Sequence, residues 1–143
     1  MTIQQLSVFV ENKHGGMAEI TEILKNQDIN IRALSIADTT DYGILRLIVD
    51  RPEAAVEALK DGGITVTLTD VIAVELPDRP GGLHEAVTAL TKADISIEYM
   101  YAFLCQLRGR AYVVLRVGDN DRAAGVLQNS GFRQMVTSDL CET

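Results

Sequence analysis

The sequence predicts an α+β protein of two successive βαββαβ units, each an antiparallel sheet with its two helices on one face. The first observation behind this prediction is an internal repeat: residues 12–31 resemble residues 78–97, and residues 55–64 resemble residues 123–132. The second is that strand-like and helix-like patterns alternate in the same order in both halves. The two copies are offset by 66 residues, from residue 12 to residue 78. This is too long for a solenoid unit, so we interpret the repeat as a duplicated small domain.

Four strands are predicted in the first half from their apolar and β-branched residues. Residues 6–10 form a short β-type run, and residues 29–37 are again strand-like. Residues 44–49 are almost continuously apolar, with Arg46 as the interruption. In residues 64–69, isoleucine, valine and leucine alternate with threonine, which is typical of a half-buried strand.

Two helices are predicted between these strands. Apolar residues recur at helical spacing from Met17 to Leu24, with charged residues on the opposite side. Pro52 suits the first turn of a second helix, where an N–H group is not needed, and Gly62-Gly63 is a common helix end. The resulting order of elements is that of the ferredoxin-like motif.

The second half repeats this order. Its predicted elements are a strand at 71–76, a helix around 83–90, strands at 95–106 and 110–117, a helix around 123–127 and a strand at 132–136. We therefore predict two ferredoxin-like domains in tandem, at residues 1–70 and 71–143, with almost no linker between them. Residues 138–143 are predicted to be frayed.

Composition and charge argue against several classes of function. The 143-residue chain has a formal net charge of −7 and no basic stripe, which argues against a nucleic-acid partner. It has no apolar run of membrane-spanning length and no signal-peptide pattern at its N-terminus. We therefore expect a cytoplasmic protein without a membrane partner.

No cofactor, metal site or catalytic site is predicted. Cys105 and Cys141 are the only cysteines, and they form no CxxC pair and no ligand pattern with a histidine. We expect Cys105, in a predicted apolar strand, to be buried. Two histidines and the spacing of the acidic residues support neither a nucleophilic triad nor a catalytic carboxylate pair. We therefore expect that the protein is not an enzyme.

The repeated element with a chemical role is a loop between a strand and a helix. Its two copies are Asn12, Lys13, His14, Gly15, Gly16 and Met17, and Asp78, Arg79, Pro80, Gly81, Gly82 and Leu83. A helix N-terminus offers unpaired N–H donors to an anion, and an Asn or Asp side chain accepts from an ammonium group. Together these groups suit the head group of a free amino acid. The same residues are also typical of a plain tight turn and helix cap, and the spacing alone leaves that alternative open.

Both halves resemble the ACT domain, a regulatory amino-acid-binding module. Residues 10–17 are similar to that family's strand-to-helix loop, and residues 76–83 match it more fully because they include Pro80-Gly81. Residues 28–31 and 94–97 resemble the start of the family's second strand. The resemblance covers nearly the whole chain, and it points to the small stand-alone proteins that consist of two ACT domains.

The resemblance implies paired domains with ligand sites at their seam. ACT domains usually pair side by side, and an amino acid at the seam contacts the loop of one domain and the second strand of its neighbour. Carried over by position, the second-strand contacts are Asn30, Ile31, Ser96 and Ile97. His14 stands where the family usually has proline, and Ser96 stands where the first copy has Asn30, so the two seams need not be equivalent. A homodimer and a regulated partner enzyme are also expected.

Two other functions remain open from the sequence. A protein-interaction or oligomerisation module without a small ligand would use exposed sheet edges, and its loops would be turns only. An acylphosphatase-like enzyme on the same fold would need an anion loop with a well-placed arginine and asparagine, and the Gly-Gly loops lack that pattern. The favoured expectation is a non-catalytic regulatory protein that binds a free amino acid or a similar small molecule.

Overall fold

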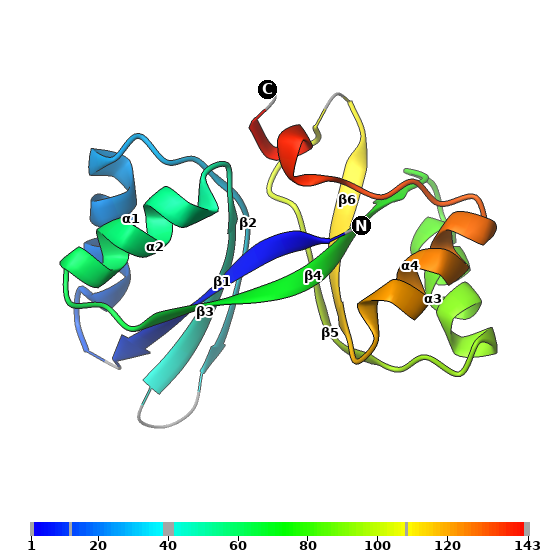
Figure 1. Ribbon diagram of the computed structural model, residues 1–143, viewed down its shortest axis with the longest axis horizontal. Helices are drawn as coiled ribbons and strands as arrows, with labels where there is room; N and C mark the ends of the chain where they lie inside the picture. Colours follow the sequence, from blue (N-terminus) through cyan, green and yellow to red (C-terminus); the bar gives the residue numbers. More distant parts are fainter. Residues whose placement is uncertain (1, 12, 39–41, 108, 142–143) are drawn as a thin grey trace. The chain divides into compact units, whose positions relative to one another are not determined.

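The computed structural model describes residues 2–11, 13–38, 42–107 and 109–141 (Figure 1). The chain forms two compact units: Gln4–Thr69, called here the N-terminal unit, and Asp70–Thr143 with Met1–Ile3, called the C-terminal unit. The predicted α+β class with tandem ferredoxin-like units is confirmed by six antiparallel strands and four α-helices in the described residues. None of the described helices is long and apolar enough to cross a membrane. The limits of 1–70 and 71–143 for two domains stay a prediction.

The N-terminal unit has the predicted order of elements along the chain. It contains most of β1 (Ile3–Glu11), α1 (Gly16–Asn26), β2 (Ile31–Asp38), β3 (Tyr42–Val49), α2 (Pro52–Asp61) and the first residues of β4 (Val66–Leu76). The strands lie in the order β2-β3-β1-β4, and α1 and α2 lie side by side on one face of the sheet (Figure 1). Leu24 and Leu59 from these helices are buried with Leu6 and Leu47, which are paired across β1 and β3.

The C-terminal unit repeats this architecture. It contains the rest of β4, α3 (Gly82–Lys92), β5 (Ile97–Ala102), β6 (Ala111–Val117) and α4 (Asn120–Asn129). The strands lie in the order β4-β6-β5, with α3 and α4 on one face (Figure 1). Leu90 and Leu127 from the helices are buried with Ile72 and Leu115, which are paired across β4 and β6.

The strand assignments differ from the sequence prediction at two places. Residues 64–69 and 71–76 were predicted as separate strands, and they form most of the single strand β4. The strand predicted at 132–136 is reduced to one bridge, between Gln134 and Val74. This short segment is held on β4 by two hydrogen bonds, of 2.8 Å from Glu75 N–H to the Arg133 carbonyl and of 2.9 Å from Met135 N–H to the Ala73 carbonyl.

The predictions for the chain end and for Cys105 were wrong. Thr137–Cys141 forms a 3₁₀ helix (η1) with Leu140 fully buried where a frayed tail was predicted, and residues 142–143 of that tail lie outside the described residues. The Asp139 carboxylate stabilises the start of this helix by accepting a hydrogen bond from Val136 N–H at 2.9 Å. The sequence of such a short polar segment does not indicate this cap. Cys105 is exposed because β5 ends at Ala102, three residues earlier than the side chain that was expected inside a strand.

In each unit, the first helix is followed by an aspartate in the left-handed backbone conformation. Asp28 follows α1 with φ 57°, and Asp94 follows α3 with φ 59°. The following amides then close the turn: Ile29 N–H donates to the Leu24 carbonyl at 3.0 Å, and Ile95 N–H does the same to Leu90 at 3.0 Å. A left-handed residue at this position is usually glycine, because a Cβ atom is strained there.

Replacing Asp94 with glycine is therefore expected to stabilise the protein. The free energy of unfolding should rise by about 0.5 to 1 kcal/mol, since the relief of left-handed strain exceeds the entropic cost of glycine. Urea denaturation measures the change. Asp121→Gly, in the first turn of α4, is the control and should instead destabilise by up to about 1 kcal/mol. Equal losses in both variants would contradict the strain argument.

Candidate functional site

The loop before α3 is a tight turn built from backbone hydrogen bonds. Arg79 N–H donates to the Pro77 carbonyl at 2.9 Å, and Gly82 N–H donates to the Arg79 carbonyl at 3.0 Å. Gly81 is the N-cap residue, with φ 88°, and its carbonyl accepts the first helical bond from Glu85 N–H at 3.0 Å. The Arg79 guanidinium Nη2 lies 2.8 and 3.0 Å from the two Glu85 carboxylate oxygens, which ties the loop to the helix.

The loop before α1 has the same geometry. Lys13 N–H donates to the Glu11 carbonyl at 2.8 Å, and Gly16 N–H donates to the Lys13 carbonyl at 3.3 Å. Gly15 is the N-cap, with φ 84°, and accepts from Glu19 N–H at 3.0 Å. Lys13 Nζ lies 3.7 Å from the Glu11 carboxylate and 3.8 Å from the Glu19 carboxylate. The sequence repeat therefore corresponds to one turn formed twice.

Most of the loop residues predicted from the sequence are exposed. Asn12 lies outside the described residues. The exposed members are Lys13, His14, Gly15, Met17, Asp78, Arg79, Pro80, Gly81 and Leu83, and the buried members are Gly16 and Gly82. The second-strand residues Asn30 and Ser96 are exposed, and Ile31 and Ile97 are half-buried.

Within one unit, the loop and the second-strand residues do not come together. Asn30 follows α1, while the loop precedes it; Ser96 and its loop flank α3 in the same way. Each helix has 11 residues and is therefore about 16 Å long. A ligand of amino-acid size cannot bridge that length, so one unit alone supplies either the loop or the second strand to a ligand.

The second-strand residues have different surroundings in the two units. Asn30 and Asp50 are linked twice, because Asn30 N–H donates to Asp50 Oδ1 at 3.0 Å and Asp50 N–H donates to the Asn30 carbonyl at 3.1 Å. Ser96 instead lines a shallow pocket of about 350 Å³ with Thr91 and Asp94. The two positions are therefore not equivalent, as the Asn-to-Ser difference suggested.

Each loop borders a pocket that sequence reasoning missed. In the N-terminal unit, a pocket of about 240 Å³ lies between the loop and residues 62–65, the turn that follows α2. In the C-terminal unit, a pocket of about 510 Å³ lies between Pro77, Glu85 and residues 130–133, the turn that follows α4. The sequence contained one indication of these turns, because Gly63 and Gly131 are aligned in the repeat. Both glycines have a positive φ in the structure, 79° and 88°.

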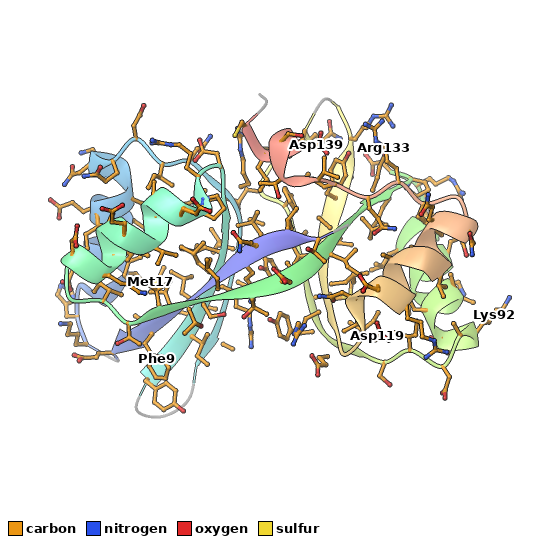
Figure 2. All side chains as sticks on the ribbon, viewed as in Figure 1. Phe9, Met17, Lys92, Asp119, Arg133 and Asp139 are labelled. Carbon is orange, nitrogen blue, oxygen red and sulfur yellow. The ribbon has the colours of Figure 1, made fainter. Side chains whose placement is uncertain are left out.

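One wall of the pocket differs between the two units. At the end of β1, Phe9 stacks on Tyr42 with ring centroids 5.0 Å apart, and Figure 2 shows the Phe9 side chain extending away from the ribbon. The aligned positions in the C-terminal unit are Glu75 and Arg110, whose Oε1 and Nη1 atoms lie 2.5 Å apart. An aromatic pair is thus replaced by an ion pair.

The Glu75 carboxylate of this ion pair helps to raise the pKa values of Arg110 and Tyr112. Hydrogen bonding to Glu75 and the charge of its carboxylate raise the pKa of Arg110 above its ordinary value. Burial, followed by the charge of Glu75, raises the pKa of the Tyr112 hydroxyl above its ordinary value. Arg110 therefore stays charged, and Tyr112 stays neutral, throughout the neutral pH range.

The described residues do not bring together a metal site. No group of three or more His, Cys, Asp or Glu side chains among them is placed to hold a metal ion. What the two loops offer is backbone N–H donors, exposed charged side chains and an adjoining pocket. Groups of this kind can form hydrogen bonds and ion pairs with a small polar molecule.

Comparisons with known proteins agree with this architecture. Protein BT0572 from Bacteroides thetaiotaomicron is 40% identical to this chain, with a TM-score of 0.92, and the match covers 100% of this chain and 98% of that one. The ligand-free regulatory subunit of aspartate kinase from Thermus thermophilus is 16% identical, with a TM-score of 0.60 and coverage of 90% and 91%. The corresponding subunit from Thermus flavus is 15% identical, with a TM-score of 0.57 and coverage of 89% and 90%.

The last two similarities, at such low identity, show the fold alone. A comparison with curated protein sequences finds no match. The family model described as "ACT domain pair" matches residues 1–143. The whole chain therefore belongs to the family of ACT domain pairs, a family of regulatory domains.

Proposed function

We propose that this protein is a non-catalytic regulator that binds a free amino acid, or a similar small molecule, at its two strand-to-helix loops. The observation that carries the proposal is that the same turn, with the same backbone hydrogen bonds, is formed before both α1 and α3. A turn that served only to reverse the chain would not need a basic residue, paired glycines and an acidic partner in both copies. The repeated chemistry favours a ligand over a plain turn.

The loop before α3 has groups for both ends of an amino-acid head group. The amides of Leu83 and His84 precede the first helical hydrogen bond, from Glu85 N–H to Gly81, so they are donors for a carboxylate. The carboxylate of Asp78 is exposed and has no hydrogen bond or ion pair with the described residues. It is therefore available to an ammonium group.

A neighbouring ACT domain completes each site in this proposal. The length of α1 and α3 keeps a loop and the second strand of its own unit apart, so the second-strand residues that contact a bound ligand come from a different domain. This requirement favours a homodimer or a larger assembly. The regulatory subunits of aspartate kinase have the same fold, and by analogy the output here is altered contact with a partner enzyme in the cytoplasm.

A thermal-shift screen against the twenty amino acids tests the proposal. A ligand at about 100 times its dissociation constant adds about 2.7 kcal/mol to the stability of the folded state. For a chain of this size, the midpoint should then rise by several degrees. Asp78→Ala should remove the part of the shift that comes from the loop before α3, and Asn12→Ala with Asp78→Ala should abolish the shift. Glu57→Ala, which removes an exposed carboxylate from the middle of α2, should leave it unchanged.

A second candidate function is favoured by the edge strand of the N-terminal unit. Leu34 and Ile36 on β2 are 37% and 49% exposed. Apolar side chains on a free strand edge favour pairing with another chain. A protein-interaction module without a small ligand would therefore give no thermal shift with any amino acid, but it would still self-associate, and Leu34→Lys would reduce that association.

A further inference from the structure

The two pockets beside the loops correspond to each other under the internal repeat, but they differ in charge. Four aligned positions carry the difference. Phe9, Glu11 and Thr65, which line the N-terminal pocket, are replaced by Glu75, Pro77 and Arg133 in the C-terminal pocket. Tyr42, which stacks on Phe9, is replaced by Arg110. The alignment of Tyr42 with Arg110 follows from the strand register, because Val10 pairs with Gly43 and its counterpart Leu76 pairs with Ala111.

The pocket of the N-terminal unit has an excess of negative charge. Its charged lining residues are Glu11, Lys13 and Glu19. Lys13 lies within 4 Å of both carboxylates, so a single ammonium group is shared between two acidic side chains. A further anion in this pocket would be repelled.

The charged lining residues of the C-terminal pocket balance, but one guanidinium is left without a carboxylate partner in the described part of the chain. Glu75 is neutralised by Arg110 at 2.5 Å, and Glu85 is neutralised by Arg79 at 2.8 Å. The remaining charged lining residue is Arg133, whose guanidinium has no hydrogen bond or ion pair with the described residues. Because the whole chain carries a net charge of −7, a cation without a carboxylate partner is against the general trend of this protein.

The backbone that carries Arg133 is held firmly. Its carbonyl accepts from Glu75 N–H at 2.8 Å, and the next residue, Gln134, is buried and donates from Nε2 to the Ala124 carbonyl at 2.8 Å. On the other side, Phe132 packs on the apolar core of the unit, and its amide donates to Leu127 at 2.9 Å. The Cα atom of Arg133 is therefore held at the edge of the pocket, and Arg133 is labelled in Figure 2.

We infer that the C-terminal pocket is a carboxylate-binding site in which Arg133 holds a carboxylate group of a small organic acid or amino acid. A guanidinium matches a carboxylate with two parallel N–H donors, and the half-buried Phe132 offers apolar contact to the carbon skeleton of the ligand. The N-terminal pocket, with Thr65 at the aligned position, lacks this guanidinium. This inference deepens the proposed function, because it adds a side-chain contact for a carboxylate beside the loop before α3.

Nuclear magnetic resonance of ¹⁵N-labelled full-length protein tests the inference with succinate as the probe. Succinate has carboxylates but no ammonium group, so its binding does not depend on the Asp78 part of the proposed site. Saturable shift changes are expected at the amides of residues 131–133 and at Arg133 Nε–Hε, and not at residues 63–65. Succinamide, the uncharged diamide, is the matched probe and should cause none of these changes. Ionic strength is held constant with NaCl because exposed charges are screened by salt.

Two exchanges of aligned residues sharpen the test. Arg133→Thr, which installs the residue of the N-terminal pocket, should weaken succinate binding at least about tenfold, and Arg133→Lys should weaken it less. Thr65→Arg should leave binding at residues 131–133 unchanged. Succinate shifts that persist in Arg133→Thr, or that appear equally at residues 63–65, would overturn the inference.

The two proposals fail independently. If amino acids bind in the thermal-shift screen but Arg133→Thr has no effect on either ligand, the carboxylate pocket is wrong and the proposed function stands. If no amino acid binds but succinate shifts Arg133 Nε–Hε, the carboxylate pocket is supported and the amino-acid function is wrong.

Discussion

Replacing Gly82 with alanine is expected to lower the free energy of unfolding by about 3 kcal/mol or more. A Cβ atom at this position would lie 2.1 Å from the carbonyl oxygen of Pro77. That oxygen belongs to the backbone and accepts from Arg79 N–H, so it cannot move without opening the turn. The loop before α3 would have to rearrange, and its ligand groups would lose their alignment.

The equivalent substitution in the other loop should be milder. A Cβ atom at Gly16 would lie 3.2 Å from the Glu11 carbonyl oxygen, which needs a shift of only a few tenths of an ångström. Gly16→Ala should therefore cost about 1 kcal/mol. Gly118→Ala is the control, because a Cβ atom at Gly118 would have no neighbour within 4 Å, and it should change stability by no more than about 0.5 kcal/mol.

Urea denaturation of the three variants measures this series. The expected order of destabilisation is Gly82→Ala, then Gly16→Ala, then Gly118→Ala. Equal effects at Gly82 and Gly16 would show that the close approach of Pro77 is not present in solution.

Replacing Leu90 with alanine is expected to destabilise the protein by about 2 to 5 kcal/mol. Leu90 is fully buried between α3 and the sheet of the C-terminal unit, and its removal leaves a cavity in a small core. Leu24→Ala, at the aligned position of the N-terminal unit, should have a similar cost because Leu24 is 1% exposed. Leu104→Ala is the exposed control, at 59% exposure, and should be close to neutral.

Thermal unfolding followed by calorimetry distinguishes how the two units respond. If the units unfold cooperatively, both variants lower a single midpoint. If they unfold separately, Leu24→Ala and Leu90→Ala each shift a different transition. A loss below about 1 kcal/mol for Leu90→Ala would contradict the assignment of this residue to the core.

Much of the fold was predictable because both halves of the sequence have the same pattern of strands and helices. A strand such as 44–49 or a helix such as that after Met17 is ambiguous in isolation, but its recurrence in the second half supports the assignment. The same recurrence located both loops, since paired glycines before an apolar helical pattern are conspicuous when they occur at matching positions. In the structure, both strand-to-helix loops form the same turn.

The remaining features depend on tertiary contacts that local patterns do not record. The strand predicted at 132–136 has the right composition, but it shares only one bridge with β4, at Val74. Residues 62–65 and 130–133 were assigned to helix ends and strands. Residues 62–65 lie beside the loop before α1 because they lead into β4, which lies next to β1. Residues 130–133 lie beside the loop before α3 because this segment is hydrogen-bonded to β4. Aligning Thr65 with Arg133 was possible from the sequence, but nothing local indicated that either side chain borders a pocket.

Isothermal titration calorimetry of the purified protein tests the central claim most directly. The account predicts saturable binding of one or a few of the twenty amino acids to the wild-type protein, and loss of that heat when Asn12→Ala is combined with Asp78→Ala, while Glu57→Ala still binds. Absence of binding heat for all twenty amino acids, at several temperatures so that a zero enthalpy is not mistaken for no binding, would contradict it.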